Sequence, residues 1–149
     1  MQDFKQPKVW QKSHSLVVRI YSATTPFPEH ERYGITNQMR RAAFSIPANI
    51  AEGCARGSRT EFRQFLDIAA GSASELEYLL LLARDLGFLT EKQHIGLCAT
   101  LHDVRLMLTR LIQRVRGANH PSEARFVRST ISQSEHHTAS LSSGPKTSN

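Results

Sequence analysis

The chain has 149 residues, enough for one domain with a single hydrophobic core, and its 19 Lys and Arg against 13 Asp and Glu give a net charge of +6. Arginine supplies 14 of the 19 cations, which favours forked contacts with phosphate or carboxylate groups. The longest apolar run, residues 78–83, is too short to span a membrane, no signal-peptide pattern opens the sequence, and the two cysteines lack C-x-x-C spacing. We therefore expect a cytoplasmic protein with reduced thiols and no membrane contact.

The first predicted helix begins near Lys8, after Pro7, and ends at residues 25–28, where two prolines impose an extended turn. Apolar and small side chains recur along it at helical spacing. Its predicted core face carries Val9, Ser13, Leu16, Val17, Ile20 and Thr24.

The second predicted helix runs from about Ile35 to Ala51 and ends at Gly53. Pro47 lies in its middle, although apolar residues keep helical spacing on both sides of it. A proline there has no N–H for the carbonyl of Ala43, and its ring crowds that carbonyl. We therefore predict a helix that continues through Pro47 with a kink.

The third and fourth predicted helices both open with a capping box, a polar pair that satisfies the free N–H groups of a helix start. Ser58 and Glu61 form the first pair, Thr90 and Gln93 the second, and Gly87 is a suitable residue to end the third helix. The predicted core positions of the third helix are Phe62, Phe65, Leu66, Ala69, Ala73, Leu76, Leu80 and Ala83. The fourth helix repeats apolar residues at steps of four and three, at Leu97, Leu101, Val104, Leu108, Leu111 and Val115.

Apolar residues at this spacing form a continuous stripe along one helix face, which is typical of an antiparallel bundle. The sequence therefore predicts an all-α, up-down four-helix bundle over residues 1–117. Residues 118–149 contain eight Ser and three Thr and lose all periodicity, which predicts a disordered tail. That segment holds three cations and two anions, so most of the net charge belongs to the bundle.

Several apolar residues fall outside these core faces when each helix is plotted at about 100° per residue. A monomeric bundle has one interior, and contiguous exposed apolar surface marks interfaces, so we expect a homo-oligomer. The predicted interface residues are Val18, Phe44, Tyr78, Leu81, Leu82 and Leu106.

Catalytic and metal motifs are weak in this sequence. Glu91 and His94 have the Glu-x-x-His spacing of di-iron bundles, but those sites need two such motifs. Glu91 has a simpler role as an acid in a first helical turn. We therefore expect no enzyme activity, catalytic residue, metal, cofactor or small-molecule substrate.

An arginine cluster is the remaining functional candidate. Arg40 and Arg41 flank or oppose the core face of the second helix, and Arg56, Arg59 and Arg63 bracket the connection to the third. With the amides at the start of the third helix they would bind RNA or DNA phosphates. Alternatively, the same arginines serve subunit contacts in a protein-interaction scaffold. Glu52 lies near a helix C-terminus, where the helix dipole disfavours a negative charge. We therefore expect it either to pair with Arg40, Arg56 or Arg59 or to remain solvated.

Five strings resemble the four-helix-bundle proteins encoded in intervening sequences of bacterial 23S ribosomal RNA genes. They are Phe4-Lys5, VWQKSH at 9–14, RYGITNQMRRAA at 32–43, SIPANIAEG at 45–53 and ARDLGFL at 83–89. Cys54 departs from the aromatic residue expected there. The resemblance implies a homo-oligomeric ring, a pentamer, with a fold similar to the accessory protein of diversity-generating retroelements, which works with nucleic acid. It implies no catalytic residues.

Overall fold

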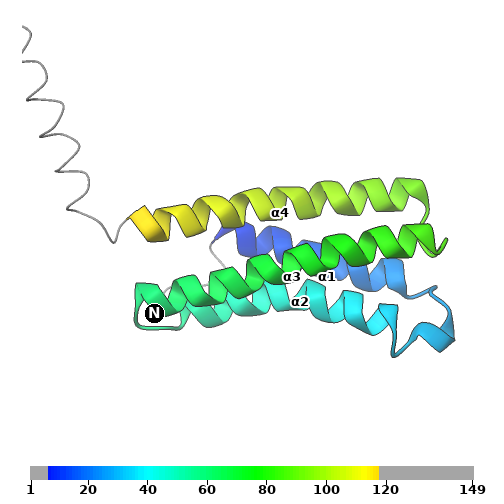
Figure 1. Ribbon diagram of the computed structural model, residues 1–149, viewed down its shortest axis with the longest axis horizontal. Helices are drawn as coiled ribbons and strands as arrows, with labels where there is room; N and C mark the ends of the chain where they lie inside the picture. The colour runs from blue at the N-terminus through cyan, green and yellow to red at the C-terminus, as the bar shows by residue number, and fades with distance from the viewer. Residues whose placement is uncertain (1–6, 118–149) are drawn as a thin grey trace, which may run out of the picture. The chain divides into compact units, whose positions relative to one another are not determined.

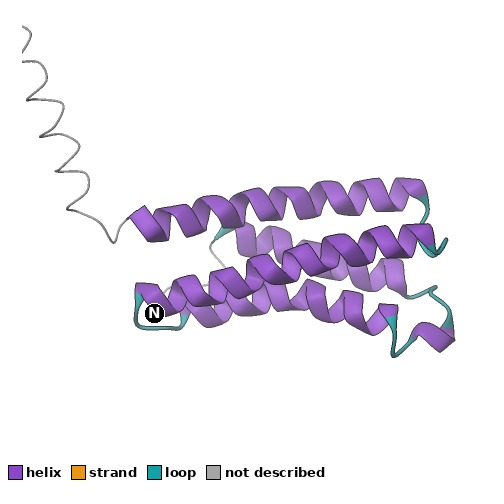
Figure 2. Cartoon of the chain, in the orientation of Figure 1, coloured by secondary structure: helices purple, strands orange, loops and turns teal. Residues whose placement is uncertain are grey.

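The computed structural model describes residues 7–117, which form four α-helices and one 3₁₀ helix and contain no strand. The helices are α1 (Lys8–Thr24), α2 (Ile35–Cys54), α3 (Arg59–Asp85) and α4 (Glu91–Gly117), and η1 (Glu29–Glu31) lies between α1 and α2. Successive α-helices run in opposite directions (Figures 1 and 2), and α2 packs against both α1 and α3. The all-α prediction is therefore confirmed, whereas the predicted tail at 118–149 lies outside the described residues.

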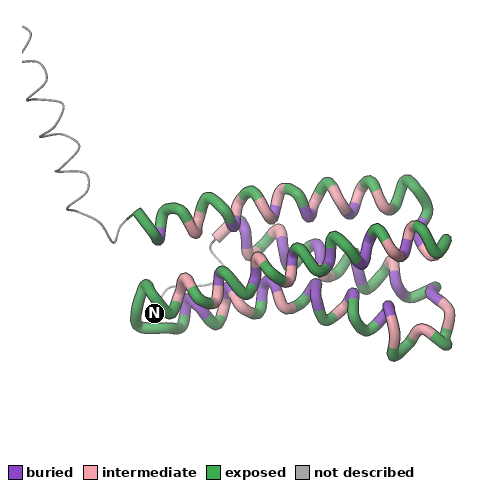
Figure 3. The backbone as a smooth tube through the Cα atoms, in the orientation of Figure 1, coloured by how far each residue is buried: buried purple, intermediate pink, exposed green. Residues whose placement is uncertain are grey.

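The core lies along the facing stripes of the four helices (Figure 3). Nearly every predicted core position is buried, and four of them are half-buried: Val17, Phe62, Phe65 and Leu111. Leu79 is also buried, although the predicted face of α3 did not include it. The apolar spacing thus predicted the direction in which each helix packs.

The helix ends follow the capping signals with one difference. Thr90 and Gln93 form the full reciprocal box, because each side-chain oxygen accepts the other residue's N–H, at 3.1 and 2.9 Å. Ser58 Oγ accepts the N–H of Glu61 at 3.2 Å, but the Glu61 carboxylate accepts from the Ser58 hydroxyl, at 2.8 Å, and not from its N–H as predicted.

Gly87 ends α3 with a φ of +77°, a conformation that glycine adopts without steric cost. The N–H of Phe88 bonds the carbonyl of Ala83 and the N–H of Gly87 bonds that of Arg84, both at 2.9 Å. This is the Schellman pattern of helix termination, and it sets the direction in which the chain enters α4.

Helix α2 continues through Pro47, which is buried, and ends at Cys54, slightly beyond the predicted end. The predicted continuation is therefore correct, and the kink stays a prediction. Just beyond Pro47, Asn49 Nδ2 donates to the carbonyl of Ser45 at 2.7 Å and to its hydroxyl at 2.9 Å.

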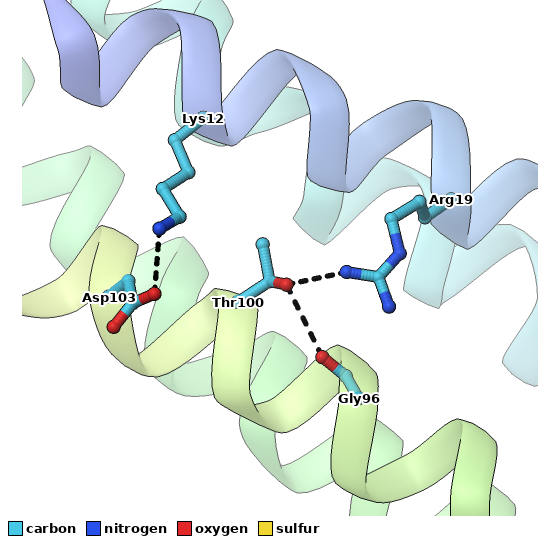
Figure 4. A network of polar contacts seen from close by, with 5 residues as sticks. All are labelled: Lys12, Arg19, Gly96, Thr100 and Asp103. Carbon is cyan, nitrogen blue, oxygen red and sulfur yellow. Dashed lines mark hydrogen bonds and ion pairs between the residues drawn. The ribbon is translucent and has the colours of Figure 1, made fainter.

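Polar side chains join α4 to α1 (Figure 4). Lys12 Nζ donates to Asp103 Oδ2 at 2.7 Å, and Arg19 Nη1 donates to Thr100 Oγ1 at 2.5 Å. Thr100 in turn donates to the carbonyl of Gly96. These contacts lie on the surface, so they orient α4 more than they stabilise the fold.

Candidate nucleic-acid interface

Arg40 is half-buried, and its guanidinium lies at the C-terminal end of α1. Its Nε donates to Thr24 Oγ1 at 2.9 Å, its Nη2 donates to the carbonyl of Tyr21 at 3.4 Å, and it lies 4.6 Å from the centre of the Tyr21 ring. A cation there compensates the negative end of the helix dipole. Arg40 is therefore tied to the α1–α2 packing, and little of its side chain is left for a ligand.

Arg56 and Arg63 each form an ion pair with a carboxylate four residues away in the sequence. Arg56 binds Glu52 and covers the ring of Phe65 at 5.0 Å, and Arg63 Nε lies 3.6 Å from Asp67 Oδ2. Arg56 is thus the partner of Glu52 among the alternatives that the sequence left open. Because all four charged side chains are partly exposed, these pairs are weak and a phosphate can compete for the arginines.

Arg41 and Arg59 are both exposed and form no ion pair with the described residues. Arg41 lies in the first half of α2, whereas Arg59 is the first residue of α3, beside its free amides. Of the five predicted arginines, these two have unengaged guanidinium groups, the form that binds phosphate bidentately.

Arg41 lies on the rim of a groove between α2 and α3, which we call the α2–α3 groove; its volume is about 340 Å³. Ser45 Oγ and Ser72 Oγ are 2.8 Å apart across the helix pair, and Asn49 extends the same hydrogen-bond network. None of these side chains was predicted to have a role. The spacing of four residues between Ser45 and Asn49, at the edge of the apolar stripe, was the available signal.

Five of the six predicted interface residues are exposed: Val18, Phe44, Tyr78, Leu81 and Leu106. Tyr78 is 60% exposed and Val18 54%. Leu82 instead is half-buried against the core, so its predicted position outside the core is wrong. Further exposed apolar side chains, which were not among the predicted interface residues, are Tyr21, Tyr33, Ile68, Leu86 and Ile95.

Phe44 and Tyr78 lie in grooves on different sides of α3. Phe44 lines the α2–α3 groove, whereas Tyr78 and Leu81 line a groove of about 370 Å³ with His94 and Cys98 of α4. Cys98 Sγ lies 3.3 Å from His94 Nε2, and burial raises the pKa of this thiol, opposed by the charge of Arg84. Cys98 is therefore a protonated, structural thiol at neutral pH.

Within residues 7–117, no three metal-binding side chains gather in one place. The helices of this part of the chain also include none with the length and hydropathy needed to cross a bilayer.

Fold and surface together define a class: an all-α bundle protein with unengaged surface arginines and exposed apolar side chains on several helices. Residues 5–110 match the family model described as 23S rRNA-intervening sequence protein, so the chain belongs to that family. It is also similar to the crystal structure of a protein with unknown function from the S23 ribosomal protein family from Bacteroides thetaiotaomicron. That similarity has a TM-score of 0.64 at 30% identity and covers 70% of this chain and 97% of that one. The curated proteins that were compared gave no match.

Proposed function

We propose that this chain is a non-enzymatic, cytoplasmic protein that assembles as a homo-oligomeric ring, a pentamer, and binds RNA or DNA phosphates with little sequence preference. The observation that carries the proposal is the pair of exposed arginines, Arg41 and Arg59, which form no ion pair within residues 7–117. Arg56 and Arg63 add cations whose ion pairs are weak enough to exchange for phosphate.

Assembly would strengthen such binding. A ring repeats Arg41 and Arg59 once per subunit, and a second contact to the same nucleic acid strand is effectively intramolecular. A ring also needs two different complementary patches on each subunit, because its interface is heterologous. Exposed apolar side chains on both sides of α3, Phe44 on one and Tyr78 on the other, support the presence of two such patches.

Fluorescence anisotropy of a labelled single-stranded RNA and a labelled duplex DNA tests the proposal, with the salt concentration varied between about 50 and 200 mM. We expect binding at low salt that falls steeply as salt rises, because bound phosphates release counterions. Arg41→Glu with Arg59→Glu should reduce the slope of log K against log salt by about one unit for each phosphate that the variant no longer neutralises.

The matched control changes two exposed cations outside the predicted cluster, Arg32→Glu with Lys92→Glu, and so alters the net charge by the same amount. It should weaken binding less than the cluster variant does. Equally weakened binding in the two variants, or no binding at low salt, would contradict the proposal. The scaffold alternative, in which the arginines contact a neighbouring subunit or a protein partner, would then replace it.

A further inference from the structure

A cavity of about 710 Å³ lies at the end of the bundle where α1 and α3 begin and α2 and α4 end. Helices α3 and α4 are joined by a short loop at the opposite end and are far apart here (Figure 1). We call this space the end cavity. Its volume falls within the range of about 300–1,000 Å³ that is typical of small-molecule sites.

The inner wall of the end cavity is apolar. Val9 and Ile50 come from the buried core, and Phe62, Met107 and Leu111 are half-buried around them. One of these residues comes from each of α1, α2 and α3, and two come from α4. The end cavity therefore lies where the apolar faces of the four helices do not pack fully against one another. An apolar wall of this size favours the burial of a hydrocarbon group, at about 25 cal/mol for each Å² covered.

The rim of the end cavity is cationic. Lys8, Arg110 and Arg114 line it, no Asp or Glu of the described residues does, and all three cations are exposed and without an ion pair in residues 7–117. Arg110 and Arg114 are one turn apart on α4, where like charges destabilise a helix. An anion between them would remove that repulsion.

We propose that the end cavity binds a single-chain fatty carboxylate, with the hydrocarbon chain against Val9, Ile50 and Met107 and the carboxylate at Arg110 and Arg114. The end cavity shares no lining residue with the arginines proposed for nucleic acid, and the sequence, which predicts no small-molecule substrate, does not indicate it.

Isothermal titration calorimetry measures binding while the full chain is titrated with laurate below the micelle concentration. Dodecanol and dodecyltrimethylammonium, which have the same chain length and a neutral or cationic head, are titrated in parallel. Laurate should saturate at one molecule per chain, and the neutral alcohol should bind about tenfold more weakly, since it lacks a charge-assisted hydrogen bond.

Arg114→Glu should weaken laurate binding by about tenfold or more. Arg32→Glu, which makes the same charge change at an exposed site that does not line the cavity, should leave it unchanged. Arg114→Gln gives a milder test if the Glu variant folds poorly.

Any of four results with the fatty ligands would overturn the proposal. They are the absence of saturable binding, equal affinity for the three head groups, equal affinities in Arg114→Glu and Arg32→Glu, and binding that requires deletion of residues 2–6. Displacement of laurate by single-stranded RNA would instead assign the cavity to nucleic acid and also refute the proposal. Failure of nucleic-acid binding alone would leave it intact.

Discussion

Gly53 lies where α3 packs closely against α2. A Cβ at this position would lie 2.8 Å from Cδ2 of Phe62 and 3.1 Å from Cβ of Phe65. Gly53→Ala should therefore lower the free energy of unfolding by about 1–2 kcal/mol, because displacement of the two aromatic residues outweighs the better helix propensity of alanine.

Urea denaturation measures this change, and Gly57→Ala is its control, since nothing lies within 4 Å of a Cβ at Gly57. If Gly53→Ala is as stable as Gly57→Ala, the close approach of the two helices is not a constraint on this position.

Asp103 connects the stability of the bundle to pH. The hydrogen bond from Lys12, and then the Lys12 charge, hold the pKa of Asp103 below its usual range, with a smaller contribution from His102 and with desolvation opposing. A carboxyl group with a lowered pKa stabilises the fold above its unfolded pKa, about 3.9, and this stabilisation is lost as the pH falls through the lowered value.

Asp103→Asn should therefore be slightly less stable than the unmodified chain at pH 7, and the difference should disappear in acid. Thermal denaturation at several pH values measures it. A difference that persists at pH 2 would show that the stabilisation comes from packing and not from charge.

At the scale of single elements, Pro47 is the main irregularity. It removes the amide that would bond the carbonyl of Ala43, yet α2 runs through it and the proline is buried. If packing imposes the predicted kink, Pro47→Ala should change the free energy of unfolding by less than about 1 kcal/mol. Gln64→Pro, at an exposed position inside α3, should cost about 3 kcal/mol or more. A decrease of several kcal/mol in Pro47→Ala would mean that the proline itself shapes α2.

The sequence predicted most of the helical elements because each signal is local. Thr90 and Gln93 cap α4, and Gly87 ends α3, through contacts within a few residues. Helix η1 was not predicted, and neither was the bond at 3.2 Å in which Glu31 Oε2 accepts the N–H of Ile35, since the two prolines before them indicated only an extended turn.

The partners of the candidate site were harder to predict, because they depend on how helices lie against one another. Arg40 belongs to the same basic string as Arg41, but the packing of α1 on α2 brings Thr24 beside Arg40 and leaves Arg41 exposed. The end cavity likewise arises where four helices meet, and its two α4 arginines lie far in sequence from Lys8.

At the scale of the whole molecule, the exposed apolar residues predict assembly. Tyr78→Glu should dissociate or weaken the oligomer without unfolding the subunit, because this side chain is mostly exposed and a carboxylate would have to be buried at the interface. Gln64→Glu is the matched control, as it adds the same charge at another exposed position of α3. Light scattering gives the mass of each variant. An unchanged mass for Tyr78→Glu would remove this residue from the interface.

The most direct test of the central claim, an oligomer that binds nucleic acid through its arginines, is sedimentation velocity of the full chain with a fluorescent single-stranded RNA. At low salt, the RNA should sediment with a protein oligomer of about five subunits. At high salt it should sediment alone while the protein stays oligomeric, because salt screens the phosphate contacts and not the apolar interface. A protein that sediments as a folded monomer, or RNA that sediments free at low salt, would contradict the account.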